Sequence, residues 1–195
     1  MTAAATPSRE TQKETLGTLL GGRPIVLVGM MGAGKTTVGR RLAARLGRHF
    51  VDSDEEVERA AGMSIEDIFA SHGEGDFRAG EQRVIARLLK DHDLVLGTGG
   101  GAFINPETRA LVKESAISVW LRADPDLLFQ RVQRRSNRPL LKTANPRETL
   151  QQLIEARYPI YAEADIVVTS KDVPQDQVAT EIIDALLAHF GAADA

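Results

Sequence analysis

One stretch of this sequence organises the rest: residues 25–36 read IVLVGMMGAGKT. Its first four residues are apolar and mostly β-branched, which is typical of a short strand buried on both faces. The next eight, Gly29–Thr36, fit the pattern G-x-x-x-x-G-K-[ST]. Apolar residues then recur at helical spacing from Val38 to Leu46, and Gly47 ends that predicted helix. A strand, a glycine-rich loop and a helix in this order predict a loop that binds a polyphosphate.

The chemistry of this loop favours a nucleoside triphosphate with its metal ion. Glycines let the backbone wrap closely around a ligand, so that successive N–H groups point at phosphate oxygens. The start of the following helix adds its positive dipole end. Lys35 supplies a point charge for the β- and γ-phosphates, and the Thr36 hydroxyl is an oxygen ligand of the kind that Mg²⁺ prefers. The alternative, a turn that only connects a strand to a helix, is disfavoured because motif and context agree.

Two absences narrow the class of nucleotide-binding protein. A GTPase reads guanine with Asn-Lys-x-Asp, but none of the asparagines, Asn105, Asn137 and Asn145, precedes a lysine. A nucleic-acid motor carries an acidic residue near the end of its third strand, whereas the candidate strand here ends in Leu96-Gly97-Thr98-Gly99. These features favour a small-molecule kinase in which another carboxylate serves the metal.

Composition limits the remaining possibilities. The chain has 195 residues, 43% hydrophobic and 26% charged, which is typical of one globular domain. Its net charge of −3 argues against binding nucleic acid through bulk charge. There is no cysteine, which excludes disulfides, thiolate nucleophiles and zinc–thiolate sites. Residues 1–15 lack the apolar core of a secretory signal, and the charge-free stretch Pro24–Gly34 is too short to span a bilayer. We therefore expect a cytoplasmic enzyme without a membrane partner.

Short apolar runs alternate with helical patterns along the chain, which predicts an α/β fold with a parallel sheet and helices on both faces. We expect residues 1–22, rich in Ala and Thr, to be a flexible tail or a short frayed helix, and residues 23–195 to form a single domain. The predicted strands are 25–28, 49–51, 94–96, 116–121 and 165–169. The predicted helices are 38–46, 54–61, a short one after Ser64, 81–90, one from Asp124, 147–161 and 178–190.

Asp52 and Asp54 directly follow the second predicted strand. Ligands of an open parallel sheet bind outside the carboxyl ends of its strands, so both carboxylates should lie on the same rim as the phosphate loop. One of them could hold Mg²⁺ through water while the other accepts a proton from a substrate hydroxyl. Capping of the following helix is an equally open alternative.

Further features are candidates for a second substrate site, each with a plain structural alternative. Arg78 opens a predicted helix, where its charge opposes the helix dipole, and Glu81 lies on the same face; a surface ion pair is the commoner case. The triplet Gly99–Gly101 allows the backbone to approach a ligand, or is a simple loop. Residues 131–142 carry five basic side chains, which fits either a solvated face or a lid that lowers arginines onto phosphates. Arg157 has either a structural or a binding role.

In combination these motifs resemble those of the shikimate kinases. The matches follow the family's order from Pro24 to Phe190, while residues before Arg23 lie outside the resemblance. The matching stretches are Gly29–Gly39 (GMMGAGKTTVG), Asp52–Asp54 (DSD), Phe77–Glu81 (FRAGE), Thr98–Gly101 (TGGG), Arg138–Leu141 (RPLL) and Arg157–Tyr161 (RYPIY).

The resemblance implies a P-loop fold like that of the nucleoside monophosphate kinases, with five parallel strands in the order 2-3-1-4-5. It also implies a substrate-binding region at about 53–81 and a mobile lid at about 131–145. The implied reaction transfers the γ-phosphoryl group of ATP to the 3-hydroxyl of shikimate, on the way to chorismate and the aromatic amino acids.

For ATP, the resemblance assigns a magnesium ligand to Thr36 and a water-mediated magnesium contact to Asp52. It assigns an ATP contact to Arg138 of the lid and an adenine contact to Gln175. Lys35 and Arg138 neutralise charge during transfer. The residues assigned to the phosphates are Gly32, Ala33, Gly34, Lys35, Thr36 and Thr37.

For shikimate, the resemblance makes Asp54 a contact for hydroxyl groups and the candidate base. It makes Arg78 and Arg157 the groups that grip the carboxylate, since a forked guanidinium suits a planar carboxylate. Gly100 contacts a hydroxyl through its backbone, and Glu81 supports Arg78.

Two other functions stay open at this point. A gluconate-type sugar-acid kinase uses the same scaffold and also needs a carboxylate grip, although the pairing of Phe77–Glu81 with the glycine triplet favours shikimate. A nucleotide-dependent binding module would bind ATP without making a phosphorylated product. In each case we expect a monomer that binds no nucleic acid.

Overall fold

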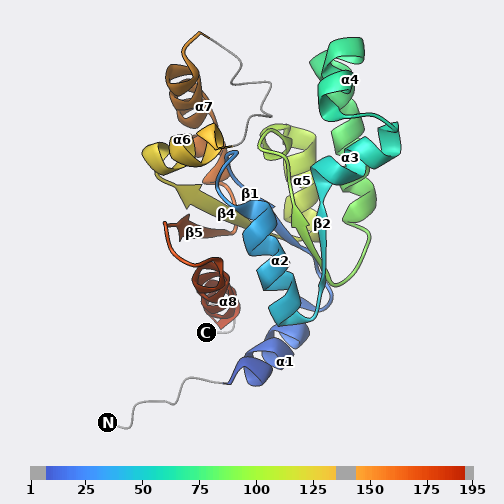
Figure 1. Ribbon diagram of the computed structural model, residues 1–195. Helices are drawn as coiled ribbons and strands as arrows, with labels where there is room; N and C mark the ends of the chain where they lie inside the picture. Colours follow the sequence, from blue (N-terminus) through green and yellow to red (C-terminus); the bar gives the residue numbers. More distant parts are fainter. Residues whose placement is uncertain (1–7, 135–143, 192–195) are drawn as a thin grey trace.

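The computed structural model describes residues 8–134 and 144–191, which form five strands surrounded by helices (Figure 1). The strands are β1 (Ile25–Val28), β2 (His49–Asp52), β3 (Leu94–Gly97), β4 (Ile117–Ala123) and β5 (Ile166–Ser170). The helices are α1 (Arg9–Leu20), α2 (Lys35–Leu46), α3 (Ser53–Ala61), α4 (Ile65–Leu88), α5 (Pro106–Ser115), α6 (Pro125–Gln133), α7 (Pro146–Tyr161) and α8 (Gln175–Gly191), with a 3₁₀ turn, η1 (Ala102–Ile104).

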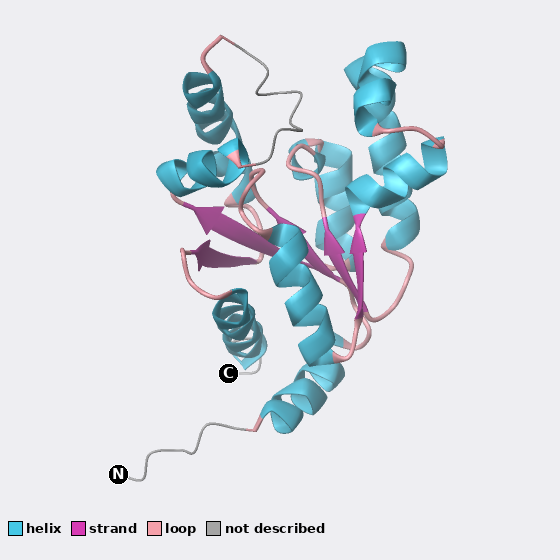
Figure 2. Cartoon of the chain, in the orientation of Figure 1, coloured by secondary structure: helices cyan, strands magenta, loops and turns pink. Residues whose placement is uncertain are grey.

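The strands make one parallel sheet in the order β2-β3-β1-β4-β5 (Figure 2), so the predicted α/β fold and strand order are confirmed. Every residue of β1 and β3 is buried, as their continuous apolar sequences predict. Because the strands are parallel, their carboxyl ends form one edge of the sheet. The loops after β1, β2 and β3 therefore meet at that edge.

Helices cover both faces of the sheet. α2 connects β1 to β2 and packs beside α8; Figure 1 shows α2 in front of the strands and α8 below β5. The connections from β2 to β3 and from β3 to β4 run across the sheet in the opposite direction. Right-handed crossovers therefore place α4 and α5 on the other face. The core lies between these layers, and Val26, Leu27 and Val95 in its centre are fully buried.

Residues 9–20 are not a flexible tail. They form α1, which begins at an N-cap where the Ser8 hydroxyl accepts a hydrogen bond from the Thr11 backbone and ends at Gly21 in the left-handed region. Leu16 and Leu20 are 0% and 1% exposed, and α1 packs against α2 and α8. A short helix was one of the two alternatives for this segment, but the sequence does not show that it is docked rather than frayed, because few apolar residues stand among many polar ones. Two apolar side chains on one face are enough to dock a helix when they pack into a hydrophobic groove.

The segment from Ser64 to Lys90 holds two helical stretches, as predicted, but the second begins directly after Gly73 rather than near Glu81. Ser64 does cap a helix, but α4 continues to Leu88 across a kink at Gly73, where φ is 83° and ψ is 173°. Arg78 therefore lies inside a helical segment that starts after the kink, rather than at a helix start. Glycine permits this positive φ, which ends the first helical stretch and redirects the chain into the second.

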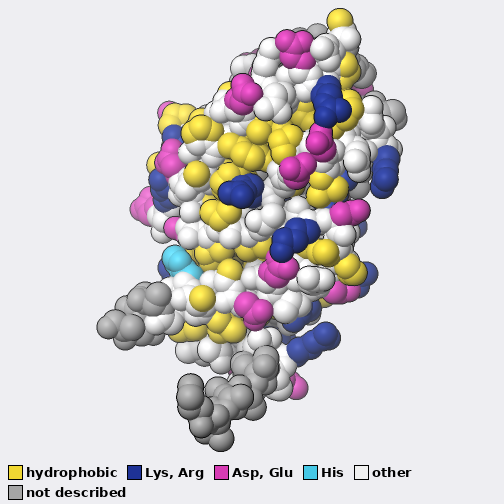
Figure 3. All heavy atoms as spheres, turned by 90° about the vertical axis from the view of Figure 1, so that its left-hand side faces the viewer, with side chains coloured by type: hydrophobic (Ala, Val, Ile, Leu, Met, Phe, Trp, Pro, Cys, Tyr) yellow, Lys and Arg dark blue, Asp and Glu magenta, His cyan; other side chains and the backbone are white. Residues whose placement is uncertain are grey.

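Charged side chains on one face of the molecule are spread out rather than gathered (Figure 3). On the face drawn in Figure 3, acidic and basic side chains are interspersed with hydrophobic ones, in keeping with the small net charge. Among residues 8–134 and 144–191, no helix combines the length and the apolar character that crossing a membrane requires.

Candidate active site

The loop between β1 and α2 holds the predicted phosphate-binding residues. Gly29 has a φ of 135°, and a Cβ atom there would lie 2.7 Å from the carbonyl oxygen of Leu121, so only glycine fits this close to β4. α2 then begins at Lys35, whose ammonium folds back and donates to the carbonyl oxygens of Gly29 (2.7 Å) and Met30 (2.9 Å). The positive end of a helix and a lysine thus share one loop, an arrangement that attracts an anion.

Asp52 links α2 to the start of α3. Its Oδ2 accepts a hydrogen bond from the Thr36 hydroxyl (2.8 Å), and its Oδ1 accepts one from the backbone N–H of Asp54 (3.0 Å). Asp52 is therefore the N-cap of α3, which is one of the two alternatives that the sequence left open. The same carboxylate also reaches the Thr36 hydroxyl, so capping does not exclude a role in the site.

A cavity of about 320 Å³ opens over this loop. Gln175 reaches it from the start of α8, and its Oε1 is buried without a hydrogen-bond partner among the described residues. Ala33, by contrast, is fully buried and does not line the cavity. The lining contains many of the residues predicted from the sequence, namely Gly32, Gly34, Lys35, Thr36, Thr37, Asp52, Asp54, Gly100 and Gln175.

Of the predicted lid, the structure describes residues 131–134 at its start and 144–145 at its end. Arg138 lies outside the described residues. Arg131, at the beginning of the basic run, contacts the phosphate loop: it donates to the carbonyl oxygen of Gly32 (3.4 Å) and to the hydroxyl of Ser170 (3.1 Å). The Ser170 hydroxyl in turn donates to the carbonyl oxygen of Ala33 (2.9 Å). Arg131 is therefore neither a solvated side chain nor a free lid residue, because it braces the loop from α6.

A second, smaller cavity of about 90 Å³ adjoins the first. The two cavities share Met31, Asp54, Gly99 and Gly100, so a group bound in one lies beside a group bound in the other. The smaller one has charged and apolar sides, lined by Met31, Asp54, Ile65, Phe69, Phe77, Arg78, Glu81, Gly99, Gly100, Gly101 and Arg157. Such a mixture suits a small ring that carries a carboxylate and hydroxyls.

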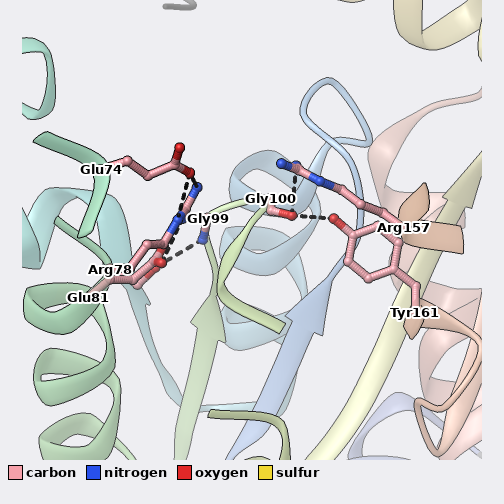
Figure 4. Close-up of polar contacts among 8 residues, drawn as sticks. Glu74, Arg78, Glu81, Gly99, Gly100, Arg157 and Tyr161 are labelled. Atoms are coloured by element: carbon pink, nitrogen blue, oxygen red, sulfur yellow. Dashed lines mark hydrogen bonds and ion pairs between the residues drawn. The ribbon is translucent and has the colours of Figure 1, made fainter. Parts of the chain in front are cut away.

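Two carboxylates orient Arg78 in this cavity (Figure 4). Its NH1 donates to Oε2 of Glu81 (2.7 Å), while its Nε (3.3 Å) and NH2 (3.2 Å) donate to Oε1 of Glu74. Burial disfavours the charged guanidinium, but the two carboxylates outweigh burial, so the pKa of Arg78 is raised. Burial also raises the pKa of Glu81, against the opposing attraction of Arg78. The Glu81 side chain is only 3% exposed, so this is a buried pair rather than a surface one.

Arg157 reaches the cavity from α7. Its NH1 donates to the carbonyl oxygen of Gly100 (3.1 Å), and the Tyr161 hydroxyl donates to the same oxygen. Figure 4 shows Arg78 and Arg157 on opposite sides of the loop that contains Gly99 and Gly100. The fold thus brings together two arginines that are far apart in the sequence.

Local sequence patterns do not reveal the apolar side of the smaller cavity. Phe69 and Phe77 form an apolar wall, with their ring centroids 4.7 Å apart, and Ile65 and Met31 complete it. Apolar residues at helical spacing are read as core residues, and nothing local distinguishes a wall of a cavity from the core. Tyr161 ends the motif Arg157–Tyr161, but its role cannot be predicted from the motif because its hydroxyl contacts Gly100 across the fold.

Comparison with known proteins agrees with this geometry. The family model for shikimate kinase matches residues 31–187. The chain belongs to the shikimate kinase family. It is 53% identical over 190 residues to a shikimate kinase of Bradyrhizobium diazoefficiens, covering 97% of this chain and 92% of the relative. It is 55% identical over 185 residues to one of Rhodopseudomonas palustris, covering 95% of this chain and 90% of the relative.

Solved structures of shikimate kinases have the same fold. A shikimate kinase from Acinetobacter baumannii in complex with shikimate has a TM-score of 0.85 and 41% identity, covering 90% of this chain and 97% of that one. A gluconokinase from Sinorhizobium meliloti has a TM-score of 0.58 and 19% identity, which shows a shared fold alone. The resemblance inferred from the motifs is therefore confirmed.

Proposed function

We propose that this chain transfers the γ-phosphoryl group of ATP to the 3-hydroxyl of shikimate, giving ADP and 3-phosphoshikimate for aromatic amino acid biosynthesis. The observation that carries this function is the pair of adjoining cavities. One opens over a phosphate-binding loop, the other holds two arginines, and Asp54 lies where they meet. Membership of the shikimate kinase family supports the choice of substrate.

In the larger cavity, the backbone of the loop binds the ATP phosphates. Lys35 moves its charge from loop carbonyl oxygens to the β- and γ-phosphates, and Gln175, which lines the same cavity, contacts adenine. We assign Arg138 to the γ-phosphate, from its position in the family motif. The loop residues in this proposal are Gly32, Ala33, Gly34, Lys35, Thr36 and Thr37.

Magnesium fits the pair formed by Thr36 and Asp52. The Thr36 hydroxyl and the Asp52 carboxylate lie 2.8 Å apart on the wall of the larger cavity and offer hard oxygen donors. We assign direct coordination to Thr36 and a water-mediated contact to Asp52. When bound, Mg²⁺ neutralises phosphate charge, and the protein residues keep the triphosphate and the acceptor hydroxyl in line.

In the smaller cavity, the guanidinium groups of Arg78 and Arg157 bind the shikimate carboxylate from opposite sides. Charge-assisted hydrogen bonds of this kind contribute about 1.5–3 kcal/mol each. Glu81 holds Arg78 in place, and the backbone of Gly100 contacts a ring hydroxyl. The apolar wall packs against the ring.

Asp54 accepts the proton of the 3-hydroxyl as that oxygen bonds to the γ-phosphorus. The bond between the γ-phosphorus and the bridging oxygen of ADP breaks in the same transfer. The transition state is loose, so positioning and charge neutralisation contribute more than the base does. We further propose that the enzyme acts as a cytoplasmic monomer, since residues of one chain line both cavities.

A coupled assay of ADP release tests the function with purified protein, Mg²⁺ and ATP. We expect release with shikimate, and none with gluconate or without an acceptor. Lys35→Met should abolish the release while the circular dichroism spectrum is retained, which excludes a contaminating kinase. Release with gluconate instead would assign the chain to the sugar-acid kinases, and ATP binding without release would make it a binding module.

A further inference from the structure

The carbonyl oxygen of Gly100 accepts two hydrogen bonds from α7. One comes from NH1 of Arg157 (3.1 Å), and the other comes from the hydroxyl of Tyr161. We propose that Tyr161 is a positioning residue for the acidic substrate: its hydroxyl holds the Gly100 carbonyl, and this carbonyl in turn orients Arg157. The proposal rests on the proposed function, in which Arg157 binds the carboxylate of shikimate.

The burial of Tyr161 indicates that its hydroxyl has a specific role. The residue is 0% exposed and its ring packs in the core, where phenylalanine would fill the same space. Its oxygen also lies 3.9 Å from the sulfur of Met30, in the phosphate loop. Burial raises the pKa of Tyr161 to about 12, so the phenol stays a hydrogen-bond donor at any ordinary pH.

Gly100 lies where a small shift of the backbone changes both cavities. A Cβ atom on Gly100 would come within 3.4 Å of the Met31 backbone nitrogen and 3.5 Å of the Arg157 guanidinium. The strand before it ends at Gly97, so neighbouring strands do not hold this carbonyl. The two donors from α7 hold this carbonyl instead. One of them, Arg157, must also bind the substrate. Tyr161 therefore keeps the carbonyl fixed while Arg157 engages the carboxylate.

Other contacts hold α7 itself in place. The ring of Tyr158 packs edge-on against Trp120 with centroids 4.9 Å apart, and its hydroxyl donates to the carbonyl oxygen of Ala123. Removing the Tyr161 hydroxyl therefore leaves the helix docked on β4. Tyr158 is also a matched control, since its hydroxyl donates to a backbone carbonyl from the same helix but outside both cavities.

The test compares Tyr161→Phe with Tyr158→Phe by steady-state kinetics. For Tyr161→Phe we expect the KM for shikimate to rise about five-fold, the effect of one lost hydrogen bond, with the KM for ATP unchanged. For Tyr158→Phe we expect a lower melting temperature with the KM for shikimate unchanged. An unchanged KM for shikimate in Tyr161→Phe overturns the proposal, and so does an equal rise in both variants.

A double-mutant cycle with Arg157→Ala separates positioning from a structural role. If Tyr161 acts through Gly100 on Arg157, Tyr161→Phe should raise the KM for shikimate less in the Arg157→Ala background than in the wild type. Independent, additive effects overturn the proposal. Wild-type protein that does not phosphorylate shikimate overturns the proposed function and this inference together, whereas an active wild type with an unaffected Tyr161→Phe variant overturns this inference alone.

Discussion

Arg78 occupies the space that a side chain on Gly101 would fill. A Cβ atom on Gly101 would lie 2.5 Å from three atoms of the Arg78 guanidinium. The φ of Gly101 is −100°, an ordinary value for any residue, so close approach rather than backbone conformation demands glycine here. Glu81 holds the guanidinium from the other side, so it has little freedom to withdraw.

Gly101→Ala should therefore displace Arg78 and raise the KM for shikimate about ten-fold or more, with the KM for ATP unchanged, because a misplaced binding group costs more than its contact energy. Steady-state kinetics with each substrate varied measures this. Gly80→Ala is the matched control, since a Cβ atom there meets nothing within 4 Å. A normal KM for shikimate in Gly101→Ala would mean that Arg78 does not bind the substrate where the structure places it.

Glu74 should compete with the substrate for Arg78. It accepts hydrogen bonds from Nε and NH2 of Arg78, yet its side chain is 58% exposed, so it is the weaker of the two partners. Glu74→Gln should lower the KM for shikimate about two-fold, the size of an exposed helical ion pair. Asp76→Asn removes an equal charge from the same helix and should leave that KM unchanged. A raised KM in Glu74→Gln would show that Glu74 supports binding instead.

Asp54→Asn should reduce kcat about 100-fold, which is at the low end for the loss of a general base. The effect is this small because a general base contributes little to a loose transition state. The KM for ATP should stay unchanged, because Asp54 lies at the boundary of the cavities rather than in the phosphate loop. Glu55→Gln, an exposed change in the same helical turn, is the control. Retained kcat in Asp54→Asn would remove this carboxylate from the chemistry.

Glu81 should make stability depend on pH. Burial raises the pKa of Glu81 in the folded state above the ordinary 4.5 of the unfolded state. Between these two pKa values, the folded state binds more protons than the unfolded state. Its contribution to the free energy of unfolding is therefore fully present below 4.5 and lost as pH rises through the raised value. In urea titrations from pH 4.5 upward, the wild type should lose stability relative to Glu81→Gln. If the free energies of unfolding of the wild type and Glu81→Gln change in parallel with pH, the pKa of Glu81 is not raised.

Leu16→Ala should reduce the free energy of unfolding by about 2–5 kcal/mol, the usual cost of truncating a fully buried leucine. Both KM values should stay unchanged, because α1 is remote from the cavities. Thr15→Ala, on the exposed side of the same helix, is the control, with stability read from urea denaturation. Equal stability of the two variants would mean that α1 does not contribute to the core.

Local patterns predicted a large part of this protein. The strand and loop at residues 25–36, the capping serine at Ser64 and the positions of all five strands follow from residue type and spacing, although most strands end one or two residues from their predicted ends. The kink at Gly73 and the docking of α1 do not, because each depends on what the rest of the chain packs against it. A glycine in a helical pattern is equally compatible with a break, a kink or an uninterrupted helix.

The sequence by itself predicted a polyphosphate-binding loop after the first strand of a parallel sheet, because that motif is contiguous and its physics is local. Only the tertiary structure decided which distant groups line the smaller cavity beside that loop. Arg78 of α4 and Arg157 of α7 meet at the glycine triplet, and Tyr161 reaches Gly100 across the same gap. Such contacts depend on strand order and helix packing, which bring together residues that no local spacing relates.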